Sequence, residues 1–270
     1  MRLTTKIILG VIISVFLLSF SAIIYISFQS EGDSNDNILS ISQENITSVD
    51  IEPYKTILID EEIKEERRNF FPAGMLYVKP VINEEEMNKL FLPEELLRYT
   101  DITSSNDTLI IRLKIDELYK KYITAPNRIG MYMLHGVNFF IHPHTVDVIC
   151  NIGGIKVDIR NIKTDIIHTN TNGGITIDSC QVNLIEPNMN KRGRLLLTNS
   201  QVKELNIDLD NVGNTWQIVN CDIEVENLTG GGQHRVTLPK SEAKIMNWLP
   251  KNKSAQLTVT LQGDTARVVF

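Results

Sequence analysis

The sequence contains two similar segments that begin twenty residues apart, and this repeat limits the possible folds more than any other feature. GGITIDSCQV begins at Gly173, and GRLLLTNSQV begins at Gly193. Glycine recurs on the same interval at Gly153 and Gly213. A chain that repeats one strand-and-turn unit folds by stacking the units, because no single unit can bury its own apolar face.

Each unit contains the same three parts in the same order. An alternating apolar run comes first, starting at Ile155, Ile175, Leu195 and Trp216. A small polar pair follows, at Ser179-Cys180, Asn199-Ser200 and Asn220-Cys221. A branched residue comes two places later, at Val182, Val202 and Ile223. The parity of the apolar positions switches across the pair, so the pair is predicted to form a corner.

The corner has a specific expected geometry. Its first residue lies at the bend, where asparagine is suited because it tolerates left-handed backbone angles. Its second residue is small and points inward. Cys180 and Cys221 would then lie at equivalent corners two units apart, or about 9.6 Å, which is beyond disulfide reach. Cys150 is the third cysteine, and three sparse cysteines do not form a disulfide framework. Free, buried thiols are therefore expected at Cys180 and Cys221.

These features predict a mainly β fold. Twenty extended residues span about 66 Å less the turns, which is one coil of short strands, and successive coils stack about 4.8 Å apart. The expected fold class is a parallel (right-handed) β-helix or solenoid with coils of about 20 residues, preceded by a small α+β entry or cap region. Val182, Val202 and Ile223 are expected to align in one inner column.

The N-terminal residues differ from the rest of the chain. Residues 7–28 carry no charge and no proline, and 22 residues give about 33 Å of helix, enough to cross a bilayer. Arg2 and Lys6 precede this stretch, so the N-terminus is expected in the cytoplasm and the remainder outside it. The prediction is a single-pass signal-anchor in the cell membrane with an extracytoplasmic (periplasmic) C-terminal domain. A cleaved signal peptide is the alternative.

The chain divides into four expected parts, and the second half carries the repeat. They are an anchor at 1–30, a linker at 31–47, the α+β entry or cap region at 48–125 and the solenoid at 126–270. Within the entry region, branched and partly alternating segments predict strands at 56–60, 75–81 and 107–115. Residues 83–99 are expected to form one helix, or two short ones divided at Pro93.

Few residues form a pattern that indicates chemistry. One segment holds His135, His142 and His144, and the last two could share a strand face and bind a metal. Pro143 between them and the lack of a nearby carboxylate weaken this interpretation, and surface histidines are the alternative. Asp158 and Asp178 are expected at equivalent outward positions on successive coils, about 5 Å apart, where a glycosidase pair could form. His168 and His234 stand alone in the sequence. No catalytic, cofactor-binding or metal-binding residue is assigned.

Trp216 and Trp248 are expected to pack in the core, and Trp248 could stack on a sugar if it is exposed. The formal net charge of -6 disfavours a nucleic-acid partner, because phosphate binding needs clustered lysine and arginine.

NDTLIIRLK, starting at Asn106, and YITAPN, starting at Tyr122, stand before the repeats. This order resembles the putative auto-transporter adhesin head domain called the GIN domain, a family common in Bacteroidetes. LFLPEELLRYTDI, starting at Leu90, falls where that family has a short helix. The resemblance covers residues 48–270 and implies a β-helix-like domain outside the inner membrane, without established catalytic residues.

The function expected from these patterns is a membrane-tethered, extracytoplasmic, non-enzymatic scaffold or adhesin-like binding module of the bacterial envelope. Its expected partners are the membrane, through residues 7–28, and a protein or glycan on the solenoid surface. Two alternatives remain open at this point. One is a carbohydrate-active β-helix enzyme, a lyase or hydrolase, and the other is the outer sensing domain of a membrane signalling partner.

Overall fold

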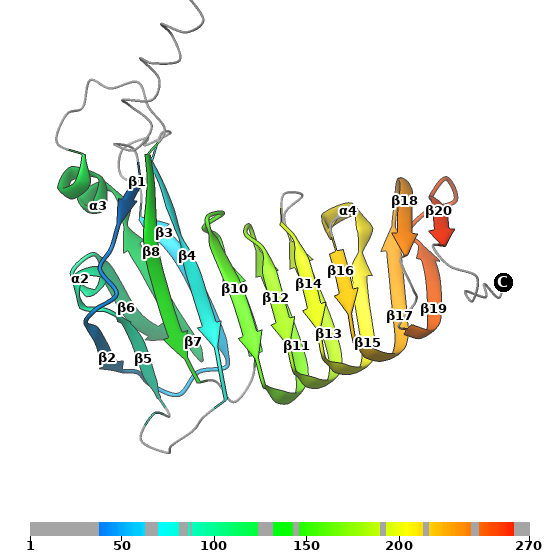
Figure 1. Ribbon diagram of the computed structural model, residues 1–270, viewed down its shortest axis with the longest axis horizontal. Helices are drawn as coiled ribbons and strands as arrows, with labels where there is room; N and C mark the ends of the chain where they lie inside the picture. Colours follow the sequence, from blue (N-terminus) through cyan, green and yellow to red (C-terminus); the bar gives the residue numbers. More distant parts are fainter. Residues whose placement is uncertain are drawn as a thin grey trace, which may run out of the picture.

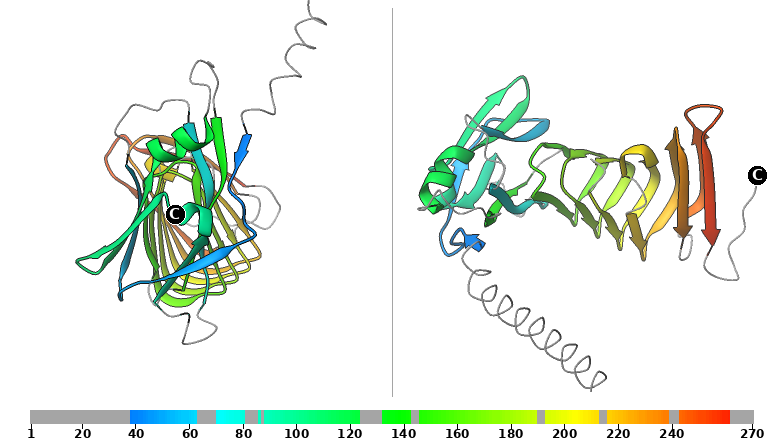
Figure 2. Two further views of the ribbon diagram at one scale, coloured as in Figure 1. Left: turned by 90° about the vertical axis from the view of Figure 1, so that its left-hand side faces the viewer. Right: turned by 90° about the horizontal axis from the view of Figure 1, so that it is seen from above.

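The computed structural model describes residues 38–62, 70–80, 86, 88–123, 132–142, 146–189, 193–212, 216–238 and 243–261. Over these residues the chain is elongated, with its N-terminal strands at one end and its C-terminal strands at the other (Figure 1). Two large β-sheets face each other along this axis (Figure 2).

The first large sheet has nine strands in the described residues. In sheet order they are β16 (Trp216–Val219), β14 (Leu195–Thr198), β12 (Ile175–Asp178), β10 (Ile155–Arg160), β4 (Phe70–Val78), β8 (Tyr132–Ile141), β5 (Lys89–Pro93) and β2 (Ile46–Asp50), with β1 (Ile38–Ser40) also on β8.

The second large sheet also has nine strands in the part of the chain described. They are β19 (Ala243–Pro250), β17 (Asp222–Gly230), β15 (Gln201–Asp208), β13 (Gln181–Met189), β11 (Lys163–Thr171), β9 (Val146–Cys150), β3 (Thr56–Glu62), β7 (Thr108–Lys114) and β6 (Thr100–Ser105). A separate pair consists of β18 (Gln233–Leu238) and β20 (Gln256–Leu261). The helices are α2 (Glu94–Leu97), α3 (Ile115–Tyr122) and α4 (Leu209–Val212).

The repeat read from the sequence sets the strand register. From β10 to β17 the chain alternates between the two sheets, and each strand pairs in parallel with the strand one unit later. Val182 lies opposite Val202, which lies opposite Ile223. These three side chains are 3%, 3% and 0% exposed, so the predicted inner column is confirmed.

The predicted corners are also confirmed. Ser179, Asn199 and Asn220 have φ angles of 55°, 49° and 55°, in the left-handed region. Cys180 and Ser200 follow them and are buried. Two of these corners donate their backbone N–H to the next unit, Ser179 to the carbonyl of Thr198 and Asn199 to that of Val219, both at 3.0 Å.

All three cysteines are free, as predicted for Cys180 and Cys221. Cys150 and Cys180 are buried, whereas Cys221 is only half-buried. The expected burial of both corner thiols therefore holds for Cys180 alone.

The fold class expected from the sequence is wrong. The strands form two mixed sheets rather than a closed β-helix or solenoid. Antiparallel pairs join β2 to β5, β5 to β8 and β6 to β7. Each repeated unit gives one strand to each sheet, so the coil has two strands and does not close. The twenty-residue repeat reports only neighbours one unit apart, and it carries no information on these antiparallel pairs.

The expected entry or cap region is continuous with the two sheets. β3 pairs with β9, and β4 pairs with β10, both in parallel. Among the described residues of the helix expected at 83–99, Lys89–Pro93 form strand β5 instead, and Glu94–Leu97 form the short helix α2 directly after Pro93. β5 is a strand because Leu90 and Leu92 alternate into the core, where both are fully buried.

The membrane anchor and the localisation expected from the sequence need correction. In the described part of the chain no helix is long and apolar enough to cross a membrane. The longest of these helices, α3, has 8 residues, or about 12 Å of rise. Residues 7–28, where the anchor was expected, lie outside the described residues. The single-pass anchor, the cell-membrane localisation and the periplasmic placement are not carried further.

Candidate functional site

A shallow, open groove of about 980 Å³ crosses the outer face of the second sheet. Its lining runs from Lys55, just before β3, through β9, β11 and β13 to Lys203 on β15. The lining lies on four neighbouring strands and reaches Lys55 beside a fifth, so the groove spans about 19 Å across the sheet. The strand register fixes how the lining side chains lie relative to one another. β11 departs from strict alternation here, because Lys163, Asp165 and Ile166 are all exposed.

Asp147 forms the centre of one wall. It faces Thr56 on β3 and His168 on β11 because these residues are register partners across three neighbouring strands. The Thr56 hydroxyl donates to Asp147 Oδ2 at 2.7 Å, and His168 Nδ1 lies 2.7 Å from Asp147 Oδ1. An Nδ1–H that donates to Asp147 leaves Nε2 as the acceptor of the half-exposed ring.

A second acid lies across the groove floor from this wall. Asp165 Oδ1 accepts a hydrogen bond from Asn183 Nδ2 at 2.7 Å. Lys163 and Lys203 flank this pair, one on β11 and one on β15. Among the described residues neither lysine forms an ion pair, whereas Lys55 pairs with Asp107 at 2.6 Å. Asp147 therefore accepts a hydrogen bond from the neutral Thr56 hydroxyl and contacts the His168 ring, and Asp165 accepts one from the neutral Asn183 amide.

The groove also has an apolar strip. Ile166 is 49% exposed in its lining, and Leu184, its register partner on β13, is half-buried. An exposed isoleucine on a sheet face, with polar residues on both sides, provides a surface for an apolar part of a ligand.

Beyond the groove, the same sheet face carries a ladder of polar side chains. Asn206 donates to Glu186 at 3.2 Å, Asn227 donates to Asn206 at 2.9 Å, and Asn247 donates to Asn227 at 2.8 Å. Asn227 also donates to Glu204 at 2.9 Å. The ladder continues the row that begins at Asp147 and His168, and it holds the strands in register.

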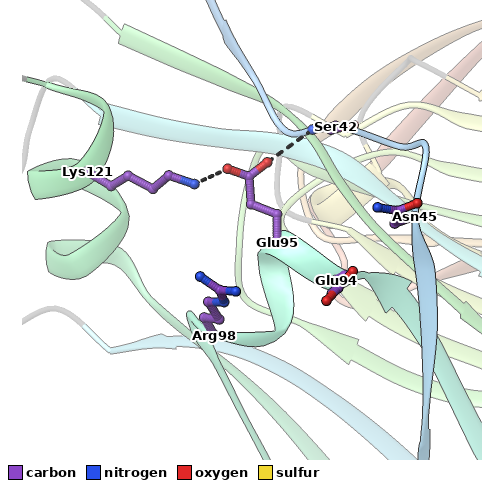
Figure 3. Close-up of a pocket in the computed structure, with 6 residues that line it drawn as sticks. All are labelled: Ser42, Asn45, Glu94, Glu95, Arg98 and Lys121. Carbon is purple, nitrogen blue, oxygen red and sulfur yellow. Dashed lines mark hydrogen bonds and ion pairs between the residues drawn. The ribbon is translucent and has the colours of Figure 1, made fainter.

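A smaller cavity of about 260 Å³ lies at the N-terminal end of the molecule (Figure 3). Glu95 of α2 points into it and forms an ion pair with Lys121 of α3. The same carboxylate accepts from Tyr122 Oη at 2.8 Å and from the backbone N–H of Ser42 at 3.3 Å. Because one carboxylate of α2 accepts from three donors, two on α3 and one on the segment around Ser42, we interpret this cavity as a structural junction.

The carboxylate pair expected from the sequence is not formed. Asp158 lies opposite Thr176, and Asp178 lies opposite Arg160, so the two acids are not at equivalent positions. Asp158 is 3% exposed and accepts from Arg160 Nε at 2.8 Å. Hydrogen bonds from Thr198 and Asn199 lower the pKa of Asp178 below its usual value.

The histidines expected near a metal lie apart from the groove. His142 Nδ1 is 2.9 Å from the carbonyl oxygen of Pro80, and His142 Nε2 is 3.6 Å from Glu86. His135 lies on β8, and His144 lies outside the described residues. Within the described ranges no group of three possible metal ligands occurs.

His234 and Trp248 belong to a structural contact. His234 Nε2 lies 3.0 Å from Asp210 Oδ1, and its ring is 6.3 Å from the ring of Trp248 in an edge arrangement. Trp248 is half-buried against the core. The exposure required for a sugar-stacking role is therefore not met.

Sequence reasoning did not find the groove. His168 stands alone in the sequence, although its structural partner Asp147 lies 21 residues before it. That offset is one repeat, which would have been the available signal. Asp165 and Asn183 are 18 residues apart, which falls outside the spacing of 20 or 21 residues found in the repeats.

Comparison with known proteins finds similarity to solved structures alone. No protein-family model matches the chain, and no curated protein matches it. A "putative adhesin" from Bacteroides fragilis is similar at 11% identity and a TM-score of 0.48, over 83% of this chain and 96% of that chain.

Two further solved structures are similar at comparable levels. A "putative adhesin" from Parabacteroides merdae has 10% identity and a TM-score of 0.37, over 83% of this chain and 99% of that one. A "putative lipid binding protein" from Parabacteroides distasonis has 12% identity and a TM-score of 0.42, over 84% and 98%. These neighbours are described as binding proteins and not as enzymes. At these scores we draw no argument from them, and the GIN resemblance is not confirmed by a family model.

Proposed function

We propose that this protein is a non-enzymatic binding module that holds an extended partner, a glycan or a protein segment, in the groove on the second sheet. The observation that carries the proposal is the groove itself. It is about 980 Å³ in volume and crosses four strands, which suits an extended molecule better than a small compact one.

The groove is built for binding with little loss of entropy. Its floor consists of strands that are hydrogen-bonded on both sides, such as β13 between β11 and β15. Its acids are already held by hydrogen bonds from Thr56 and Asn183 and by contact with His168. Because a partner would not need to order these side chains, more of the contact energy would appear as affinity.

The alternative of a carbohydrate-active enzyme has less support. It required two carboxylates close together, and Asp158 is instead buried in an ion pair with Arg160. Asp147 contacts Thr56 and His168, and Asp165 accepts a hydrogen bond from Asn183. Both groove acids therefore position neighbouring side chains. We therefore favour binding over hydrolysis.

The test is an array screen with oligosaccharides and peptides, using the full chain and two matched variants. Ile166→Arg places a large cation in the groove, and we expect it to reduce binding at least about tenfold. Ile245→Arg is the control, because Ile245 lies in the same outer row at β19 and is 54% exposed, against 49% for Ile166. It should leave binding unchanged.

Two outcomes would contradict the proposal. One is equal loss of binding in both variants, which would place the partner elsewhere or indicate a general electrostatic effect. The other is the release of new reducing ends from a bound oligosaccharide, which would indicate catalysis.

A further inference from the structure

We propose that the ligand of the groove is a neutral oligosaccharide, with one vicinal diol held by the Asp165–Asn183 pair and a C–H face resting on Ile166. This inference rests on the proposed binding function and specifies its ligand class. It is argued from the charge of the groove, the geometry of the acid–amide pair and the position of the apolar strip.

The groove lining contains charged side chains of both signs. Lys163 and Lys203 are cations in the lining, and Asp147 and Asp165 are anions in the same lining. Lys55 also lines the groove but is paired with Asp107. A groove with balanced signs creates no strong field of one sign, so it offers little to a polyanion or a polycation. The net charge of -6 on the whole chain further disfavours a polyanion.

The acid–amide pair supplies a preformed set of acceptors. Asn183 Nδ2 donates to Asp165 Oδ1, which leaves Asp165 Oδ2 and Asn183 Oδ1 as acceptors on adjoining side chains. Two neighbouring hydroxyl groups of a sugar can each donate one hydrogen bond to such a pair. Hydrogen bonds to a carboxylate are stronger than those between neutral groups.

The lysines complete the hydrogen-bonding pattern. Lys163 stands two residues before Asp165 on β11, and Lys203 stands next to Asn183 on the neighbouring strand β15. Each ammonium group is a donor only, so it suits the oxygen of a sugar hydroxyl or ring. The groove therefore presents acceptors in its centre and donors on both sides, which matches a molecule rich in hydroxyl groups.

The apolar strip distinguishes a sugar ring from a simple polyol. Ile166 is the residue after Asp165, and 49% of it is exposed. A pyranose ring has one face of C–H groups and a rim of hydroxyls, and burying such C–H surface against an apolar side chain is favourable. The ring face would lie on Ile166 while its rim reaches Asp165 and Asn183.

A peptide fits this surface less well. Recognition of a peptide backbone usually adds a strand to an open sheet edge. β13 is paired with β11 on one side and β15 on the other, so the groove centre offers side chains and no unpaired strand edge. A peptide remains an outcome that the experiment can detect.

The experiment is isothermal calorimetry of the full chain with four hexasaccharides. Three are neutral (cellohexaose, mannohexaose and maltohexaose), and hexagalacturonate is the anionic counterpart. We expect at least one neutral hexasaccharide to bind, with a Kd that changes less than about twofold between 50 and 300 mM NaCl, because a neutral ligand releases few ions. Hexagalacturonate should bind more weakly.

Two variants test the acid–amide pair. Asp165→Ala and Asn183→Ala should each weaken neutral binding about tenfold or more, because a polar site loses its fixed acceptors. Asn188→Ala is the matched control, because Asn188 lies on the same strand at a register position outside the groove lining. It should have no effect, and circular dichroism should show that all three variants remain folded.

The outcomes separate this inference from the proposed function. Preferential binding of hexagalacturonate, or of an array peptide, with loss in Ile166→Arg would overturn the neutral-sugar inference while supporting a binding groove. Neutral binding that Asn183→Ala does not change would overturn the diol assignment. If the array and the four hexasaccharides all fail to bind, both proposals fail.

Discussion

Glu226 places a carboxyl group in the core between the two large sheets. It is 2% exposed and lies in register between Leu205 and Met246. Its Oε1 atom has no hydrogen-bond partner among the described residues. Burial raises the pKa of Glu226 to about 7, and a hydrogen bond involving Trp216 opposes part of this increase. The buried carboxyl is therefore protonated below neutral pH, because the folded protein favours its neutral form.

This raised pKa makes stability depend on pH. The carboxyl pKa is raised from 4.5 when the group is exposed, so below pH 4.5 both states are protonated and Glu226 has no effect. Between pH 4.5 and about 7 the unfolded chain loses its proton first, and the folded state becomes progressively less stable. We expect Glu226→Gln to gain stability relative to wild type as pH rises, by about 1 to 3 kcal/mol at pH 8.

Urea unfolding of both proteins at pH 4.5, 6 and 8 would measure this effect. Glu224→Gln is the control, because Glu224 lies on the same strand with its side chain exposed. The stability difference between that variant and wild type should stay nearly constant with pH. A constant difference for Glu226→Gln as well would show that Glu226 does not titrate in the core.

At the residue scale, the sequence predicted corners but not this buried acid. Asn199 and Asn220 could be placed at bends because asparagine tolerates the left-handed φ they adopt. Glu226 could not be placed, because inner positions within a strand are not strictly alternate. Val182 and Ile185 both point inward although they are three residues apart. A prediction that assumes strict inward and outward alternation along β17 therefore places the Glu226 side chain on the wrong face.

At the element scale, the asparagine ladder joins β13, β15, β17 and β19 through side chains. Asn227 is its centre, with hydrogen bonds to Glu204, Asn206 and Asn247. Asn247 is the last member and makes one of these bonds. The ladder therefore predicts that equal truncations have unequal effects.

We expect Asn227→Ala to destabilise the protein by about 1 to 2 kcal/mol, because three partners lose a hydrogen bond at a half-buried position. Asn247→Ala should cost about 0.5 kcal/mol or less, because its single bond is exposed to water. Thermal and urea unfolding of both variants would test this difference. Equal losses would mean that the ladder bonds contribute little and that strand pairing alone sets the stability.

Much of the pairing of these elements could be predicted from offsets in the sequence. Units 20 or 21 residues apart predicted the parallel register from Ile175 to Leu195 and on to Trp216. The helix expected at 83–99 could not be corrected from sequence, because KLFLP is short and lies beside a true helical turn. Its partners on β2 and β8 are far away along the chain. Such non-local pairs leave no periodic signal.

At the scale of the whole molecule, the two ends are closed differently. At the N-terminal end, β6 and β7 form an antiparallel pair beside β3, and the helices α2 and α3 lie at that end (Figure 1). Leu96 and Leu118 of these helices are fully buried. The twenty-residue repeat could not predict this antiparallel end, because the end contains no copy of the repeated unit.

The C-terminal end of the described structure has less packing. Among the described strands, β19 pairs only with β17, and β20 pairs only with β18. On β19, Ile245 and Leu249 are 54% and 51% exposed. Strands with one partner and exposed apolar residues open locally at a lower free energy than strands packed on both sides. Stability should therefore decrease along the molecule toward β19 and β20.

Native-state hydrogen exchange would measure this gradient. We expect the amides of β13 to be protected at least about 100-fold more than those of β19 and β20, since β13 has two strand partners and buries Ile185 completely. The two-partner strand β15 is the internal control and should resemble β13. Equal protection from β13 to β20 would mean that the described molecule opens as one cooperative unit.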